Sequence, residues 1–257
     1  MSGLLADKVG LITGVSNNRG FAWAIAEAAS KQGAELILSY GDERLEGRAS
    51  DLAKLVPTRG LIKCNVGDDE EIAAMFDTIQ KDVGRLDFVI HAIAFANKDE
   101  LEGEYVNTSR DGFSLAHDIS TYSLVALARG ARPLLLDNGG SIVTLSFQGS
   151  DRVFPHYNVM GVAKAALEAS VRYLASDLGP QGVRVNAVSA GPVRTLAASA
   201  VKGFMSLQKI MEERAPLRRN ITAEEVADAS VFLASDMAKG ITGEVIHVDA
   251  GYHITGV

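Results

Sequence analysis

Short apolar runs alternate along the chain with longer segments whose apolar positions recur at helical spacing. Such runs, bounded by glycine or polar residues, predict buried strands, and the helical spacing predicts amphipathic helices. Strands are expected at residues 9–12, 35–40, 61–64, 86–91, 141–146, 183–188 and 244–248. Helices are expected from the first glycine-rich turn to about residue 31, and at 45–55, about 69–79, 113–132, 157–179 and 226–234. The alternation, without a break in composition, predicts one doubly wound, Rossmann-like α/β domain over residues 1–257 with a mainly parallel seven-stranded sheet.

Two segments lack this regular pattern. Residues 94–109 form a long irregular stretch after the fourth strand, which is a candidate wall of a substrate site. Between 193 and 220, small residues precede a loosely amphipathic run, and we assign about 194–214 to a small lid. A pair of short helices fixed against the core is the alternative. Order resumes at Thr222 and Glu225, whose spacing predicts a capping box.

The composition excludes several classes of protein. A chain of 257 residues that is 47% hydrophobic and 22% charged is globular with a sizeable core. It shows no signal-peptide pattern, and no apolar segment approaches the ~20 residues that span a bilayer. The single cysteine, Cys64, rules out an internal disulfide, and the formal charge of −7 argues against general nucleic-acid binding. We expect a soluble cytoplasmic protein without a metal site.

The first turn from a strand into a helix has the composition of an anion-binding site. It begins at Gly14 and passes through Gly20 and Phe21 into the helix. Backbone N–H groups and the helix dipole at such a turn both favour a pyrophosphate. The glycines do not follow the G-x-G-x-x-G spacing of the dinucleotide fingerprint, so an ordinary turn is the alternative.

Charged residues follow the second strand, where a dinucleotide-binding sheet meets the adenosine ribose. Asp42 would bond the ribose hydroxyls and repel a 2′-phosphate, whereas Arg44 would attract one. The acids Asp42 and Glu43 outnumber the base, which favours NADH over NADPH. A solvated charged turn is the alternative interpretation.

Tyr157 and Lys164 lie seven residues apart on the helix expected after the fifth strand. Seven steps of about 100° return to within about 20° of the same helix face, roughly 10 Å further along the axis. A phenol and a cation at the carboxyl end of a strand suit the donation of a proton or hydrogen bond. The pattern alone is weak, because this spacing also occurs by chance on amphipathic helices.

Longer motifs extend this pair over nearly the whole chain. They lie at residues 13–15, 19, 22–26, 105–107, 117–120, 157–164, 182–192, 194–197 and 243–249. Together they resemble the short-chain dehydrogenase/reductase superfamily and, within it, the bacterial enoyl-acyl-carrier-protein reductases of fatty-acid synthesis. The Tyr-Asn-Val-Met-Gly and Arg-Thr-Leu-Ala motifs are much more specific than Tyr-x6-Lys. The resemblance implies reduction of the 2,3 double bond of trans-2-enoyl thioesters with NADH, NADPH being possible.

The resemblance also implies roles for individual residues. Tyr157 would donate to the enolate oxygen formed during reduction, and Lys164 would hold the nicotinamide ribose. Phe147 is counted with them, where many members have a second tyrosine; its missing hydroxyl is either dispensable or marks a different substrate geometry. Ala96 would lie beside the substrate with Tyr157. The implied cofactor contacts are Gly14, Gly20, Phe21, Gly41, Asn65, Val66, Ile93, Lys164, Val193, Thr195, Leu196 and Ala197.

Gly41 and Asn65 depart from the family pattern. Relatives that use NADH often have glutamine at the first position, and an aspartate that meets the adenine is usual at the second. The nearest rival function is that of a ketone-reducing member such as a 3-oxoacyl reductase, which needs a serine where this chain has Thr144. That side chain is expected in the sheet interior. A non-catalytic dinucleotide sensor is disfavoured, because Tyr157 and Lys164 are both present.

The resemblance implies two kinds of protein partner. An acidic acyl carrier protein would deliver the substrate, and four copies of the chain would form a homotetramer. Residues 195–210 are expected to form a mobile flap over the acyl chain. Basic residues near the expected opening are either a docking patch or scattered solvated charges: Lys202, Lys209, Arg214, Arg218 and Arg219.

Overall fold

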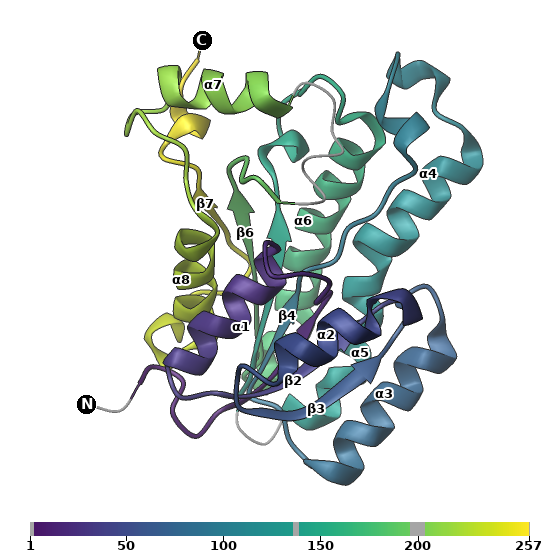
Figure 1. Cartoon of the computed structure of the whole chain (residues 1–257), viewed down its shortest axis with the longest axis vertical. Helices are drawn as coiled ribbons and strands as arrows, with labels where there is room; N and C mark the ends of the chain where they lie inside the picture. The colour runs from purple at the N-terminus through teal and green to yellow at the C-terminus, as the bar shows by residue number, and fades with distance from the viewer. Residues whose placement is uncertain (1–2, 136–138, 196–203, 257) are drawn as a thin grey trace.

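The computed structural model describes residues 3–135, 139–195 and 204–256, with only the backbone at position 204. Its seven strands form one parallel sheet in the order β3-β2-β1-β4-β5-β6-β7 (Figure 1). The strands are β1 (Val9–Thr13), β2 (Glu35–Tyr40), β3 (Thr58–Lys63), β4 (Phe88–His91), β5 (Ser141–Ser146), β6 (Arg184–Ala190) and β7 (Val245–Val248). This architecture confirms the predicted doubly wound, Rossmann-like fold.

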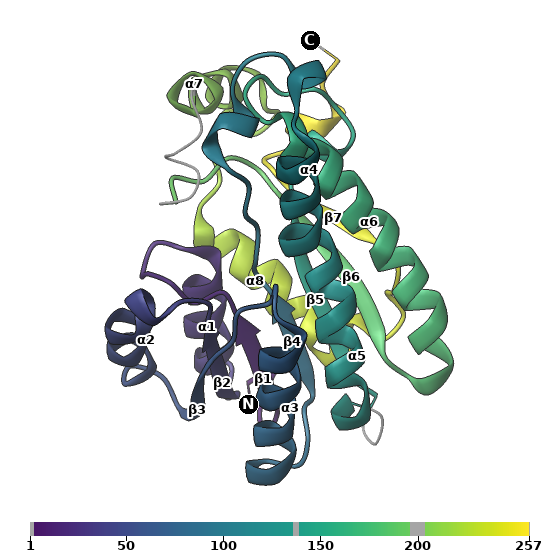
Figure 2. The ribbon, with the colours of Figure 1, turned by 90° about the vertical axis from the view of Figure 1, so that its right-hand side faces the viewer.

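Helices cover both faces of the sheet, which explains why its central strands are apolar at successive positions rather than at alternate ones. One core cluster joins the sheet to α1 (Phe21–Lys31) and α8 (Ala223–Ala234). The other joins it to α3 (Asp69–Asp82), α5 (Ser123–Leu135) and α6 (Asn158–Leu178) on the opposite face (Figure 2). The remaining helices are α2 (Glu46–Ala53), α4 (Arg110–His117) and α7 (Phe204–Arg214).

The local signals that mark helix ends are confirmed. Gly33 follows α1 with φ +91°, a backbone conformation that costs glycine little. Asp68 accepts hydrogen bonds from the backbone N–H groups of Glu70 and Glu71 at the start of α3. Thr222 and Glu225 form the predicted capping box of α8.

Two predicted helices differ from the observed ones. The single helix expected at 113–132 is instead α4 and α5 joined by a π-helical turn, Asp118–Tyr122. In that turn the hydroxyl of Thr121 donates to the carbonyl of Ala163 in α6, 2.8 Å away. The helix expected from residue 157 begins at Asn158, because His156 and Asn158 have positive φ angles of 63° and 33°. Tyr157 is therefore the capping residue rather than a residue of the helix.

The predicted lid, residues 194–214, lies partly outside the described residues. Its described part contains Arg194, Thr195 and α7. Within α7 the side chain of Met211 is buried and that of Met205 is exposed, so one face of this helix packs on the body of the protein. The expected flap thus stays a prediction.

The strand order reverses between β1 and β4, since the chain builds β1 to β3 outward in one direction and β4 to β7 outward in the other. Open α/β sheets bind ligands in the crevice outside the carboxyl ends of the strands at such a reversal. The fold therefore places a candidate site between the segments that follow β1 and β4. In the described part of the chain, no helix combines the length and apolarity needed to cross a membrane.

Candidate active site

Most of the residues implied by the family resemblance lie at one edge of the sheet. The strands are parallel, so all of their carboxyl ends meet there. Each of the first six strands contributes at least one such residue just beyond its end: Gly14, Gly41, Asn65 with Val66, Ile93, Phe147 and Val193. Leu196 and Ala197 lie outside the described residues. Positions from across the chain are thus brought to one place by the topology.

The turn after β1 fits a phosphate group. Gly14 has φ +83°, and a Cβ there would lie 2.3 Å from the carbonyl oxygen of Ala92, so only glycine lets the turn pack against the segment after β4. Gly20 caps α1, and among the described residues no side chain bonds to the N–H groups of that cap. The first turn of α1 also contains no acid, unlike that of α3. These N–H groups and the helix dipole are available to an anion.

In the turn after β2, Asp42 and Arg44 form an ion pair with each other. Asp42 accepts hydrogen bonds from the backbone N–H of Arg44 at 2.8 Å and from its guanidinium at 2.5–3.1 Å. These bonds lower the pKa of Asp42 to about 2. Gly41 is open, since a Cβ there would make only an ordinary contact with the Cys64 carbonyl at 3.9 Å.

Asn65 and Val66 follow β3 beside this pair. The backbone N–H of Asn65 donates to Glu71, and its side-chain oxygen accepts from the backbone N–H of Gly67 at 3.1 Å. Val66 is buried. This arrangement leaves the amide NH₂ group of Asn65 available to a ligand at the exposed surface.

The segment after β4 is fixed by one hydroxyl. Ser120, in the π-helical turn, accepts a hydrogen bond from the backbone N–H of Phe95 at 2.9 Å and donates to its carbonyl at 3.1 Å. Ala96, the residue expected beside the substrate, follows this anchored position and is half-buried. Ile93 packs partly on the core beneath. The π turn therefore sets the path of this segment.

Tyr157 lies in an aromatic cluster at the start of α6. Its ring centroid is 4.8 Å from that of Phe147 in an edge-on arrangement, and Phe147 is 4.8 Å from Phe154. A Cβ at Gly149 would lie 2.5 Å from the Tyr157 ring, so the turn after β5 packs directly against the phenol. Burial, followed by the charge of Glu168, raises the pKa of this phenol above its ordinary value. The group is a hydrogen-bond donor at neutral pH.

Lys164 is buried, with 5% of its surface exposed. Its Nζ donates to the carbonyl oxygen of Leu145 in β5, 2.7 Å away. Burial lowers its pKa to about 8, and the charge of Glu168 opposes that shift. The ammonium form therefore predominates at neutral pH, with two of its three donors left for other partners.

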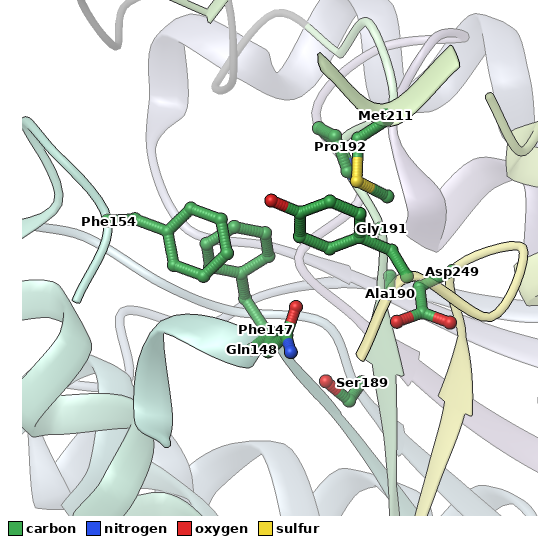
Figure 3. Close-up of a pocket in the computed structure, with 10 residues that line it drawn as sticks. Phe147, Gln148, Phe154, Ser189, Ala190, Gly191, Pro192, Met211 and Asp249 are labelled. Atoms are coloured by element: carbon green, nitrogen blue, oxygen red, sulfur yellow. The ribbon is translucent and has the colours of Figure 1, made fainter. Parts of the chain in front are cut away.

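A small pocket lies between this cluster and α7. Figure 3 shows the rings of Phe147 and Phe154 on one side of it and Pro192 and Met211 on another. Gly191 also lines the pocket, and a Cβ there would lie 3.3 Å from the methyl group of Met211. The rest of the lining is mixed, since Gln148, Ser189, Asp249 and Tyr252 bring polar groups to it.

A buried polar chain crosses the sheet below the site. His91 Nδ1 is 2.7 Å from the hydroxyl of Thr144, and His91 Nε2 is 2.8 Å from that of Ser123. The Ser123 hydroxyl donates to the carbonyl of Ile119, so Nε2 carries the proton and Nδ1 accepts from Thr144. Thr144 is fully buried, as the sequence predicted.

Three residues of this region were not identified from the sequence as site residues: His91, Glu168 and Met211. Glu168 lies four positions after Lys164, a spacing that puts both on one helix face. That spacing was the only available signal for it. His91 and Met211 reach the site through tertiary packing, which the sequence pattern does not record.

The reversal of strand order beside an uncapped helix N-terminus defines a Rossmann-like dinucleotide-binding fold. The chain belongs to the enoyl-(acyl carrier protein) reductase family, whose model matches residues 14–253. This confirms the family that the sequence motifs indicated.

Individual relatives match over almost the full chain. The chain is 54% identical to "Enoyl-[acyl-carrier-protein] reductase [NADH] FabI" of Bacillus cereus, over 98% of this chain and 99% of that protein. It is 53% identical to the protein of the same name from Bacillus subtilis, over 95% of each.

Solved structures of enoyl-acyl carrier protein reductases have the same fold over almost the whole chain. The Bacillus cereus enoyl-acyl carrier protein reductase with NADP⁺ and indole naphthyridinone has a TM-score of 0.97 at 53% identity, covering 99% of this chain and 100% of that one. The NADH reductase of Aquifex aeolicus has a TM-score of 0.97 at 49% identity, with the same coverage.

The buried His91 predicts a specific pH dependence of stability. Burial, with a smaller contribution from Lys164, lowers its pKa to about 3, whereas the unfolded chain takes up this proton near pH 6.5. Between these values the unfolded state binds more protons, so the free energy of unfolding falls as the pH falls, by up to about 1.4 kcal/mol per pH unit. Urea unfolding between pH 5 and 8, followed by Trp23 fluorescence, should show this slope.

The comparison protein is His91→Gln, which cannot titrate. Its unfolding free energy at pH 8 measures the cost of altered packing alone. Between pH 6.5 and 5 its unfolding free energy should change less steeply with pH than that of wild type, by an amount that corresponds to the uptake of up to one proton. Equal slopes in the two proteins would contradict a neutral buried His91.

Proposed function

We propose that this protein is an enoyl-acyl-carrier-protein reductase that reduces the 2,3 double bond of trans-2-enoyl thioesters with NADH in fatty-acid synthesis. The observation that carries the proposal is the pair formed by the protonated phenol of Tyr157 at the cap of α6 and the buried ammonium of Lys164 two turns along the same helix, at the carboxyl edge of the sheet. Relatives that carry the name of this NADH-dependent activity are 49–54% identical over nearly the whole chain. They confirm the activity, enzyme class and cofactor predicted from the sequence.

The dinucleotide is held by groups from several strand ends. Backbone N–H groups of the turn at Gly14 and of the N-terminus of α1 would hold the pyrophosphate. Asp42 would accept from the adenosine ribose hydroxyls, and its bidentate pairing with Arg44 would occupy the guanidinium that could otherwise attract a 2′-phosphate. This pairing favours NADH over NADPH. When bound, NADH supplies hydride to the β-carbon of the substrate.

Two side chains act on the substrate and the ribose. Lys164 is fixed by the Leu145 carbonyl and directs its other N–H groups to the nicotinamide ribose. Tyr157 donates a hydrogen bond to the thioester oxygen, on which negative charge develops as the enolate forms. The nearby ammonium further stabilises that charge. Among the described residues the Tyr157 hydroxyl has no hydrogen-bond partner, so its proton is available to the substrate.

The acyl part of the substrate is bound by apolar groups. Phe147, Phe154 and Met211 line the pocket next to Tyr157, and Ala96 supplies a small side chain on the anchored segment after β4. Phe147 has no hydroxyl, so its part in the reaction is to support the Tyr157 ring. This is the first of the two alternatives left open by the sequence, a dispensable hydroxyl.

The geometry disfavours the ketone-reducing rival. Carbonyl reduction in the superfamily needs a serine hydroxyl at the position of Thr144 to polarise the ketone. Here Thr144 is fully buried and its hydroxyl is engaged by His91. A dinucleotide sensor without catalysis would not need a free phenol donor at this place.

We also propose the acyl carrier protein as the partner that delivers the substrate, and a homotetrameric assembly. Two described members of the expected basic patch are paired with acids. Lys209 pairs with Glu213, and Arg219 pairs with Glu225. The guanidinium of Arg218 donates to the backbone carbonyl of Glu213, which leaves its charge in place. Lys202 lies outside the described residues. These pairings favour the solvated-charge alternative for Lys209 and Arg219.

Substrate preference tests the proposed function. The wild-type protein should oxidise NADH with crotonyl-CoA and leave acetoacetyl-CoA unreduced. Its Tyr157 phenol is placed to donate to an enolate oxygen, whereas the Thr144 hydroxyl is buried and cannot polarise a ketone. Absorbance at 340 nm follows both reactions. Turnover of acetoacetyl-CoA alone would favour the ketone reductase, and NADH binding without turnover of either would favour the sensor.

Replacement of Tyr157 by phenylalanine should lower kcat with crotonyl-CoA by roughly 10²-fold or more, the scale of losing one oxyanion donor. The Kd for NADH should stay near the wild-type value, since the phenol is assigned to the substrate. Tyr173→Phe, on the exposed side of α6, is the matched control. Near-normal turnover of Tyr157→Phe would show that another group donates to the enolate.

Lys164→Met keeps an unbranched side chain but removes the ammonium. It should weaken NADH binding by about 10- to 100-fold, the range of a lost hydrogen bond to a charged group, and lower kcat as well. Fluorescence titration gives the Kd directly, with Arg172→Met, exposed on the same helix, as the control. Wild-type NADH affinity in Lys164→Met would refute the assignment of this side chain to the ribose.

A further inference from the structure

Glu168 lies within the candidate site but has no role in the scheme above. It is half-buried on α6, four positions after Lys164. The hydroxyls of Ser146 and Ser150 both donate to its Oε1 atom, at 2.5 and 2.7 Å. Among the described residues no lysine, arginine or histidine forms an ion pair with this carboxylate. Partial burial of the Glu168 carboxylate costs free energy that the two hydroxyls only partly offset, which suggests that the charge has a role.

The two hydroxyls belong to the segment that supports Tyr157. Ser146 ends β5, and Ser150 ends the short helical turn Gln148–Ser150. Glu168 therefore fastens both ends of the intervening segment to α6. Between these two anchors lies Gly149, whose added Cβ would come within 2.5 Å of the Tyr157 ring.

The same segment touches α6 a second time. A Cβ added to Gly161 would lie 2.8 Å from the carbonyl oxygen of Gly149, so the turn and the helix are in direct backbone contact. Phe147, the first residue after Ser146, packs edge-on against Tyr157. A shift of this turn would therefore move both surfaces that hold the phenol ring.

The charge of Glu168 acts on the same pair of groups. It raises the pKa of Tyr157, in addition to burial, and raises that of Lys164 against burial. Its other titratable neighbour is His247 of β7, on which Asp151 also acts. His91, on β4, interacts with Lys164 from the opposite side. A negative charge here favours an uncharged phenol and a charged ammonium together.

We propose that Glu168 is a positioning residue: its carboxylate fastens the Ser146–Ser150 turn to α6 so that the Tyr157 ring is held, and it lies one helical turn from Lys164, where its charge acts on the ammonium. The consequence for catalysis rests on the proposed function. The effect on the ammonium rests only on the assignment of Lys164 to the nicotinamide ribose, and it is measured by cofactor binding without turnover.

Glu168→Gln keeps the shape and an acceptor oxygen but removes the charge. NADH binding to the full-length protein is titrated by fluorescence from pH 6.5 to 9.5. The Kd should rise on the alkaline side, because Lys164 loses its proton there. In the variant the midpoint of that weakening should fall by about one pH unit, the scale of one charge a few ångströms away in a partly hydrated site. The kcat for crotonyl-CoA should fall by up to roughly tenfold, because the two hydroxyls then bond a neutral oxygen less strongly and hold the turn, and with it the phenol, less firmly.

Two further variants separate the charge from the anchor. Ser150→Ala removes one donor and leaves the charge, so kcat should fall while the alkaline midpoint stays in place. Asp177→Asn removes an exposed negative charge from the same helix and should change neither quantity. If Glu168→Gln does not fold, Glu168→Asp, which keeps the charge on a shorter stem, should retain the midpoint and lose kcat.

The outcomes are distinct. An unchanged alkaline midpoint in Glu168→Gln, or a midpoint displaced in Glu168→Asp, would overturn the charge role. Wild-type kcat in Ser150→Ala would overturn the anchoring role. If the wild-type protein reduces no enoyl thioester, the proposed function is refuted. A lower alkaline midpoint in Glu168→Gln would then still support the action of Glu168 on Lys164.

Discussion

The site depends on one buried hydrogen bond, from the ammonium of Lys164 to the carbonyl of Leu145. A cation with 5% of its surface exposed is stable only where polar partners replace water. The carbonyl at the end of β5 supplies one such partner and fixes where α6 crosses the sheet. Because Tyr157 caps that helix, the same contact sets the distance of the phenol from the sheet edge. The shape of the site thus follows from the need to satisfy one buried charge.

The parallel sheet explains why the other groups gather around this bond. The strands from β2 through β6 in the sheet order are buried on both faces, and all the strands end at the same edge. The reversal between β1 and β4 leaves a crevice there that no crossover helix covers. Gly14 and Ile93 border it from opposite halves of the sheet. The turn at Gly14 closes on Ala92 only because it lacks a side chain.

Elements whose identity is local could be predicted from the sequence. The central strands were evident because burial on both faces requires an unbroken apolar run, whereas the strand expected at 61–64 is β3, Thr58–Lys63, which has no fully buried residue. The capping box was evident because its two residues are three apart. The start of α6 was misplaced by one residue. His156 and Asn158 have positive φ angles there, and the Asn158 side chain donates to the carbonyl of Gly103, a contact distant in sequence that no helical spacing records. The π-helical turn was missed for a similar reason. Its Thr121 and Ser120 bond to α6 and to the segment after β4, which no helical spacing records.

The substitution of Phe147 has a consistent physical interpretation in this structure. A second phenol at this position would stand beside Tyr157, whose ring centroid is 4.8 Å away, and would offer a competing donor. The phenylalanine instead leaves an apolar wall against the ring and keeps burial as the largest cause of the raised pKa. The Tyr157 phenol stays protonated and has no hydrogen-bond partner among the described residues. The position of the ring alone therefore decides where its proton points. In the proposed reaction, catalysis depends on how rigidly the ring is held. The turn from Ser146 to Ser150, and the carboxylate that fastens it, would then bear on the reaction without touching the substrate.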